Sequence, residues 1–156
     1  MSALLDKFIN LCNIPKWDIH NYLPGNQNKQ HDTILTDYHL TKISEHYYFR
    51  HNITRDIYLC LRGDVYFYIL AEYLDQVNCV LPLSPTNNLQ HHISEKTFMN
   101  IINNKGDVLM AGKLSVDDGR ITCWRPFDSF TGDPGRYQRA LDSDAIKNLL
   151  TLHLIN

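Results

Sequence analysis

Long apolar runs are missing from this 156-residue sequence, and its opening residues lack the pattern expected of a secretory leader. No stretch approaches the roughly 18 apolar residues of a membrane-spanning helix, so we expect no membrane span. The opening MSALLDKFINLCNIPKW shows no basic segment followed by an apolar core, which predicts synthesis in the cytoplasm without a secretory signal. Export by a specialised secretion system stays open, because it would leave no mark in a sequence of this kind.

Closely spaced cysteine pairs are also missing. Cys12, Cys60, Cys79 and Cys123 are far apart and form none of the motifs that zinc sites use. Without a signal peptide, we expect free buried thiols in a reducing compartment rather than disulfides. A chain of this length buries enough apolar surface to fold without a bridge or a metal.

Positive charge is not concentrated anywhere along the chain. The formal net charge is −2 and the arginines are scattered, so the basic stripe of a nucleic-acid binder is missing and nucleic acid is an unlikely partner. Hydrophobic residues make up 44% of the sequence, which is typical of a folded globular protein rather than a disordered one. The length favours a single domain over residues 1–156.

The first half of the chain suggests one helix followed by strands. Residues 2–13 have apolar positions at helical spacing, and the polar stretch 20–32 favours a loop. Residues 33–49 lean towards strand because they are rich in β-branched and aromatic side chains. The segment RDIYLCLRGDVYFYILAEYL predicts a hairpin turning at Gly63-Asp64, since glycine accepts positive φ; its second half is alternatively the start of a helix.

The second half predicts a short helix over 97–106 and a clear hairpin. The hairpin runs from Val108 to Trp124 and turns at Asp117-Asp118-Gly119. The stretch 125–137 contains two prolines and two glycines and is expected to be a long loop, and Asp142 or Ser143 then caps a final helix. The predicted fold class is therefore α+β, with a central antiparallel sheet built from hairpins and helices at both termini.

The order of motifs from residue 57 to 137 resembles a domain of some bacterial effector and toxin proteins and of plant IQ-motif proteins. That domain has a hairpin, an HHSSF box, an AG-containing hairpin and an SGHY motif. Here QHHIS stands for the box, MAGKLSVDDGRI for the second hairpin and Gly135-Arg136-Tyr137 for the last motif, with arginine in place of histidine. The resemblance implies a bacterial effector or toxin, with Arg136 and Tyr137 as candidate binding residues.

The histidine pair in this box is the first candidate for catalysis. His91 and His92 are neighbours, so on a strand their rings point to opposite faces and would not hold one metal together. One of them can act as acid, base or hydrogen-bond donor beside Ser94, because an imidazole pKa near 6.5 suits proton transfer. The competing interpretation, which we favour, is a histidine pair that orders the connection by hydrogen bonds.

The stretch Tyr38-His39-Leu40-Thr41 resembles the His-x-Thr strand of ADP-ribosyltransferases of the His-Tyr-Glu type. The resemblance implies that NAD is the cofactor and that His39 binds the nicotinamide ribose. Tyr38 and Thr41 belong to the same stretch and are candidate cofactor-binding residues, Tyr68 (or Tyr66) supplies the aromatic floor, and Glu72 supplies the acid. A carboxylate is needed there because positive charge develops on the ribose in the transition state.

Two weaker patterns share the same histidine. His39 and Thr41 pair formally with His92 and Ser94 as two His-x-Ser/Thr motifs, a feature of two-histidine phosphoesterases. A metal site can also be drawn from the segment His31-Asp32 together with Asp37 and His39, but a polar loop leading into a strand is the preferred interpretation, and no metal is expected.

Aromatic residues crowd the middle of the chain, and tyrosine is common at protein interfaces. Trp124, Arg125, Phe127 and Phe130 form a further cluster suited to recognition. These features keep two functions in view. The first is an effector or toxin domain, ADP-ribosyltransferase-like in its chemistry. The second is a non-enzymatic binding protein, such as an immunity protein or a secretion chaperone, whose LLDKF opening is similar to that of type III chaperones. In either case another protein is the expected partner.

Overall fold

The computed structural model describes residues 14–19, 22–24, 35–82, 91–150 and 154. A seven-stranded sheet dominates them, with strand order β4-β3-β6-β5-β8-β9 and with β1 added alongside β5. Its strands are β1 (Lys16–Asp18), β3 (Leu35–Ile43), β4 (His46–His51), β5 (Ile57–Leu70), β6 (Asn78–Pro82), β8 (Val108–Asp117) and β9 (Arg120–Pro126). A separate parallel pair joins β2 (Tyr22–Pro24) to β7 (His91–Ile93).

The predicted strand content of residues 33–49 is confirmed by the β3–β4 hairpin. Its two turn residues, Ser44 and Glu45, have φ values of 49° and 73°. Two successive positive φ angles match the twist of the flanking strands, which explains the tight connection. The predicted second hairpin is also confirmed: β8 and β9 pair antiparallel, and Asp118 and Gly119 form the turn with φ values of 51° and 76°.

The hairpin predicted at Gly63-Asp64 is wrong, because β5 is one continuous strand of 14 residues. Its second half does not become a helix either. Strand β8 pairs with β5 from Arg62 to Leu70, so the chain gains more ladder hydrogen bonds by running straight on than by turning. Gly63 keeps the positive φ expected of a turn glycine, at 125°, but uses it to bend the strand.

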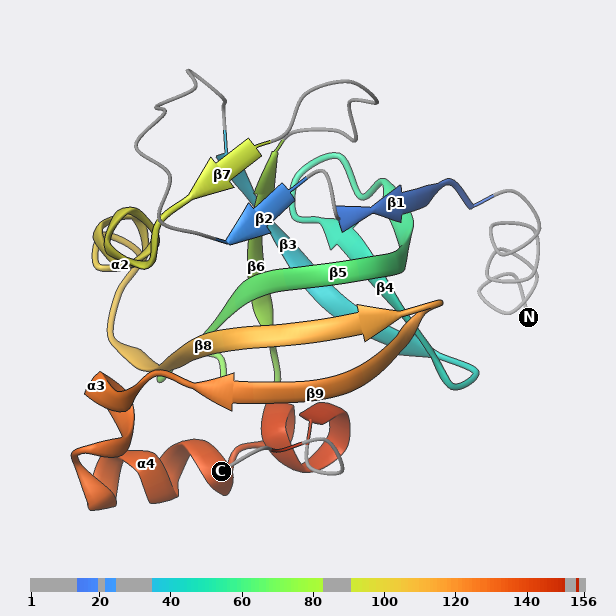
Figure 1. Ribbon diagram of the computed structural model, residues 1–156. Helices are drawn as coiled ribbons and strands as arrows, with labels where there is room; N and C mark the ends of the chain where they lie inside the picture. Colours follow the sequence, from blue (N-terminus) through green and yellow to red (C-terminus); the bar gives the residue numbers. More distant parts are fainter. Residues whose placement is uncertain (1–13, 20–21, 25–34, 83–90, 151–153, 155–156) are drawn as a thin grey trace.

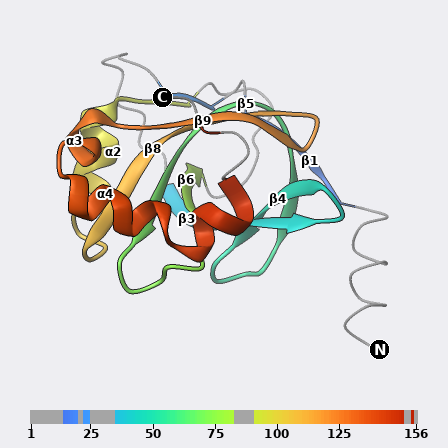
Figure 2. The ribbon, with the colours of Figure 1, turned by 90° about the horizontal axis from the view of Figure 1, so that it is seen from below.

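The bend lets β5 close the sheet on itself. Its first half pairs with β4 and its second half with β6, while β3 joins β4 to β6 on the far side. Figures 1 and 2 show the resulting curved wall. Buried aromatic side chains pack against one another inside it. Trp17 makes edge-on contacts there with Tyr38, Phe49 and Tyr58, at centroid distances of 5.4, 6.2 and 5.3 Å.

The C-terminal helical turn η2 (Ile146–Leu150) plugs one end of this wall. The Tyr47 hydroxyl donates to the Leu149 carbonyl at 2.7 Å, and the Trp124 indole N–H donates to the Leu150 carbonyl. The last carbonyls of a helix lack partners within the helix, so these side chains satisfy them. The Ser143 hydroxyl accepts from the Ile146 amide at the other end, as predicted for the cap of the final helix.

The predicted α+β arrangement with helices at both termini is wrong. The described residues form mostly antiparallel sheet, and their helices are α2 (Glu95–Ile102), α3 (Asp128–Thr131), α4 (Pro134–Leu141) and η2, all in the second half of the chain. The helix predicted over 2–13 lies outside the described residues. Among the helices that are described, none has the length and apolar content required to cross a membrane.

The loop predicted over 125–137 is also wrong, because α3 and the first half of α4 lie within it. Pro134 occupies the first turn of α4, where its missing N–H removes no helical hydrogen bond. Asp133 caps this helix by accepting from the Arg136 amide at 3.2 Å. In this segment proline and glycine do not exclude helices. Gly132 ends α3 and Pro134 begins α4.

Helix α2 confirms the short helix predicted after the histidine pair. It covers the outer face of β5, where the ring of Phe98 stacks on Tyr66 with a centroid distance of 4.6 Å. Phe98 and Ile102 are both buried by this contact side of the helix. The sheet is thus covered by α2 on one face and by α4 and η2 on the other (Figure 1).

We expect Gly112→Ala in β8 to lower the free energy of unfolding by at least about 2 kcal/mol, because overpacking against backbone is not easily relieved. A methyl group there would lie 2.0 Å from the Arg125 carbonyl oxygen and 2.8 Å from the Pro126 Cα. Gly135→Ala in α4 is the control, since its methyl would meet nothing closer than 3.8 Å. Urea denaturation measures both, and equal stability of the two variants would contradict the close packing of β8 on β9.

Candidate functional site

The outer face of β5, β8 and β9 carries a pocket of about 470 Å³. Strand register places its floor in two cross-strand rows. One row runs Asp64, Ser115, Cys123, and the other runs from Tyr66 through Lys113 to Arg125. Because residues directly opposite one another point to the same face, all these side chains project from one side of the sheet.

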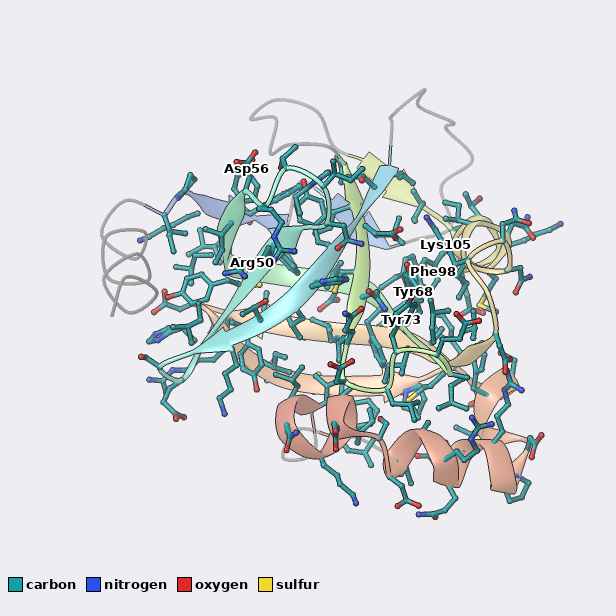
Figure 3. The ribbon with its side chains drawn as sticks, turned by 180° about the vertical axis from the view of Figure 1, so that it is seen from behind. Arg50, Asp56, Tyr68, Tyr73, Phe98 and Lys105 are labelled. Atoms are coloured by element: carbon teal, nitrogen blue, oxygen red, sulfur yellow. The ribbon has the colours of Figure 1, made fainter. Side chains whose placement is uncertain are left out.

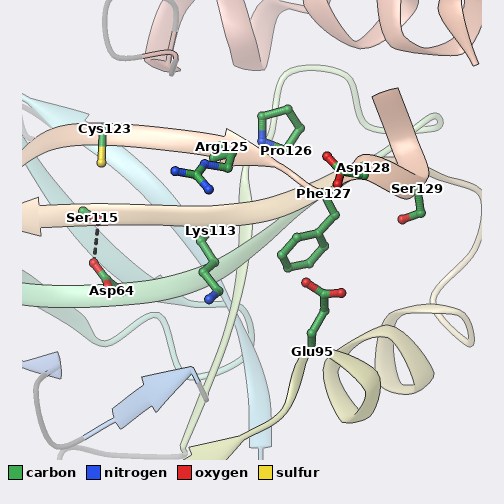
Figure 4. A pocket seen from close by; sticks show the side chains of 10 residues that line it. All are labelled: Asp64, Glu95, Lys113, Ser115, Cys123, Arg125, Pro126, Phe127, Asp128 and Ser129. Atoms are coloured by element: carbon green, nitrogen blue, oxygen red, sulfur yellow. Dashed lines mark hydrogen bonds between the residues drawn. The ribbon is translucent and has the colours of Figure 1, made fainter. Parts of the chain in front are cut away.

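Short helices form the far wall of the pocket. Glu95 projects from the first turn of α2. Phe127 directly precedes α3, and its ring points towards Glu95 (Figure 4). The Phe127 ring is held edge-on against Tyr66 at 5.8 Å and against Phe98 at 6.2 Å. Asp128 completes this end of the pocket, so an aromatic wall lies between two carboxylates.

Two cations occupy the middle of the pocket floor. Lys113 and Arg125 are exposed and lie directly opposite each other on β8 and β9. The ion pairs formed by described residues are made elsewhere in the molecule, and neither cation takes part in one. The Lys113 ammonium lies 5.8 Å from the centre of the Tyr66 ring. The nearby Asp64 carboxylate instead accepts a hydrogen bond from the Ser115 hydroxyl.

The thiols behave as predicted wherever they are described. Cys60, Cys79 and Cys123 are free, whereas Cys12 lies outside the described residues. Burial is the main reason that the pKa values of the Cys60 and Cys79 thiols are raised. Both thiols are therefore inert packing groups. Cys123 is half-buried and lines the pocket.

The predicted histidine pair lies on β7, whose backbone pairs with β2: His91 opposite Tyr22 and His92 opposite Leu23. Their side chains lie outside the described part of the structure. Ser94 caps α2, since its hydroxyl oxygen accepts from the Thr97 amide at 3.1 Å. This contact gives Ser94 a structural role.

Tyr38, predicted to bind a cofactor, is fully buried in the aromatic cluster. Its hydroxyl donates to the Pro82 carbonyl at 3.1 Å, and its ring meets His51 edge-on. A ligand cannot reach it without opening the core. Thr41 is half-buried on the same strand, opposite Tyr48.

Tyr68 belongs to a polar contact that joins β5, β3 and the segment after α2. Figure 3 labels two of its members, Tyr68 and Lys105. Its hydroxyl donates to one Asp37 oxygen at 2.8 Å, and the Lys105 ammonium binds the other at 2.7 Å. Burial, followed by the Asp37 charge, raises the pKa of Tyr68, so the hydroxyl stays protonated as a donor. These contacts anchor α2 to the sheet.

His39 lies half-buried on β3, between Arg50 on β4 and Asn78 on β6. Its pKa is lowered mainly by burial and next by the positive charge of Arg55, so the ring is neutral. Glu72 is exposed in the turn after β5. In the part of the chain that the structure describes, no hydrogen bond or ion pair joins Glu72 to His39 or Tyr68. The predicted His-Tyr-Glu group is not assembled by direct contacts.

Arg136 and Tyr137, predicted as binding residues, hold α4 on the sheet instead. The Arg136 guanidinium donates to the Val108 carbonyl and to the Asp107 carboxylate at the start of β8. Tyr137 packs half-buried against the core. Neither residue lines the pocket. Sequence reasoning singled out Arg125 and Phe127 for recognition, but it missed Lys113 and Ser115, because only strand register brings them beside β9.

Among the described residues, no group of three or more histidine, cysteine or acidic side chains could hold a metal ion. The His31-Asp32 part of the metal site considered from the sequence lies outside them. No protein-family model, no curated protein and no solved structure matches this chain.

We expect His39→Gln to make stability less sensitive to acid. The folded-state pKa of His39 is below its unfolded value of 6.5, so the unfolded chain binds a proton first as the pH falls. The stability that neutral His39 contributes is present above pH 6.5 and is lost towards its folded pKa. Urea midpoints at about pH 7.5 and about pH 5.5 measure this. An equal loss in both proteins would show that His39 is not held neutral.

Proposed function

We propose that this protein is a non-enzymatic binding protein that docks a partner protein on the outer face of β5, β8 and β9. We call this surface the docking face; it comprises Asp64, Lys113, Ser115, Cys123, Arg125 and Phe127. The observation that carries the proposal is the pocket of about 470 Å³ sunk into it. A hollow of this size accommodates one or two side chains of a partner as anchors.

Two further features support docking. The floor of the pocket consists of sheet strands whose other side is buried core, so the surface is rigid and little order is lost on binding. Phe127 adds an aromatic contact beside charged groups, a combination that protein interfaces favour. The candidate catalytic groups, in contrast, are separated: His39 is on β3, Ser94 caps α2 and Arg136 ties down α4.

The partner is sought by placing a photo-crosslinking amino acid at position 115, within the docking face, and at position 100, on the exposed side of α2, in cells of the source organism. We expect a protein that is crosslinked from position 115 alone. Mass spectrometry identifies it, and the partner is then purified for calorimetry.

We expect Ser115→Arg to weaken the affinity for that partner by about tenfold or more, because the long side chain fills the pocket. Asn100→Arg adds the same charge at an exposed position of α2 and should leave the affinity unchanged. Titration calorimetry with the purified partner measures both. Equal binding by the two variants would remove the docking face from the proposal.

The effector function with ADP-ribosyltransferase-like chemistry has one observation in its favour. His39 is neutral and lies in the same cross-strand row as Tyr68, with Asn78 between them. If the protein only binds, incubation with millimolar NAD should release no nicotinamide, and expression in bacteria should not slow growth. Chromatography of the reaction tests this. Nicotinamide release that disappears in His39→Ala would establish the enzyme instead.

A further inference from the structure

The two cations of the docking face are placed where they repel each other. Lys113 and Arg125 are directly opposite on antiparallel strands, a position in which like charges destabilise the sheet. Ion pairs in the described structure join Arg62 to Asp18 and Arg136 to Asp107, so the fold does pair arginines with acids elsewhere. Neither Lys113 nor Arg125 has an ion-pair partner among the described residues, so both can pair with an anionic group of a partner.

The surroundings favour an anion that reaches in from outside. Three carboxylates also line the pocket: Asp64, which accepts from the Ser115 hydroxyl, and Glu95 and Asp128 at the end beside Phe127. None of them forms an ion pair with Lys113 or Arg125. The floor beneath Lys113 is the Tyr66 ring, which is itself covered by Phe98. Lys113 and Arg125 are exposed in the free protein, and a docked partner surface would exclude water from them, which strengthens charge-assisted hydrogen bonds. Phe127 offers an apolar surface in the same pocket.

We propose that Lys113 and Arg125 form a subsite for a carboxylate, supplied by an aspartate or glutamate side chain of the partner protein. The Lys113 ammonium and the Arg125 guanidinium both donate to the carboxylate, and the apolar part of the same partner segment rests on Phe127. This inference rests on the proposed docking function and specifies the chemistry that the partner presents.

Cys123 lies in the same pocket and reports on its electrostatic field. In a Cys12→Ser background it is the one described thiol that is not buried, since Cys60 and Cys79 are enclosed. The thiolate attacks a disulfide reagent, the reagent's S–S bond breaks and an aryl thiolate leaves. We compare the rate with dianionic dithiobis(nitrobenzoate) to the rate with neutral dithiodipyridine. Because both reactions need the thiolate, their ratio cancels any change in thiol pKa.

We expect the double variant Lys113→Gln/Arg125→Gln to lower this anionic-to-neutral rate ratio by roughly tenfold, because without the two cations only the carboxylates of the pocket act on the dianionic reagent. The control is Arg120→Gln, which removes an exposed cation of β9 that does not line the pocket. Its ratio should stay near that of the parent protein. A ratio that is unchanged in the double variant would overturn the subsite.

A small carboxylate provides the second arm. Phenylacetate should slow the reaction of Cys123 with the neutral reagent, the neutral analogue phenylacetamide should not, and the double variant should lose this protection. The melting temperature of the double variant should be equal to or higher than that of the parent, since the repulsion is removed. Protection by both compounds alike would show an apolar pocket without a carboxylate subsite.

The two proposals fail separately. If Ser115→Arg abolishes partner binding while the rate ratio is insensitive to Lys113 and Arg125, docking stands and the carboxylate subsite is wrong. If the ratio and the phenylacetate protection depend on both cations but no partner is crosslinked from position 115, the site binds small carboxylates. In that case the partner carboxylate is wrong.

Discussion

The pairing of β5 with four other strands is the constraint on which the rest of this structure depends. Its first half lies between β1 and β4, and its second half between β6 and β8. Gly63, with its positive φ, stands between the two halves and allows the change of direction. Without that bend the strand could not join β4 to β6, and the aromatic cluster around Trp17 would lose its enclosing wall.

The two faces of the bent sheet are covered by different elements. The pocket lies on the outer face, beside the part that α2 covers. The inner face is sealed by η2, whose terminal carbonyls accept from Tyr47 and Trp124. Among the described residues, α2 covers one end of the outer face, where it sets Phe98 on Tyr66 and the Tyr68–Asp37–Lys105 contacts fix the helix in place. The part of β5, β8 and β9 that lines the pocket is the proposed docking face.

Local signals in the sequence predicted the elements that depend on local chemistry. The Asp118-Gly119 turn and the Ser143 cap could be predicted because each requires particular residues within a few positions. The Gly63-Asp64 turn was misjudged, because long-range pairing with β8 overrode a sound local preference, and Pro134 was taken for a helix breaker although it begins a helix. Most of the pocket could not be predicted from the sequence. Asp64 and Ser115 are 51 residues apart in the chain, and only the pairing of β5 with β8 brings their side chains together.

Period-two alternation separates folding from recognition in β8 and β9. Leu114, Val116 and Trp124 point into the core, while their sequence neighbours Lys113 and Cys123 point into the pocket. Substitutions at the outward positions therefore leave the inward packing of Leu114, Val116 and Trp124 in place. The proposed docking face can thus change its side chains without cost to the core beneath it.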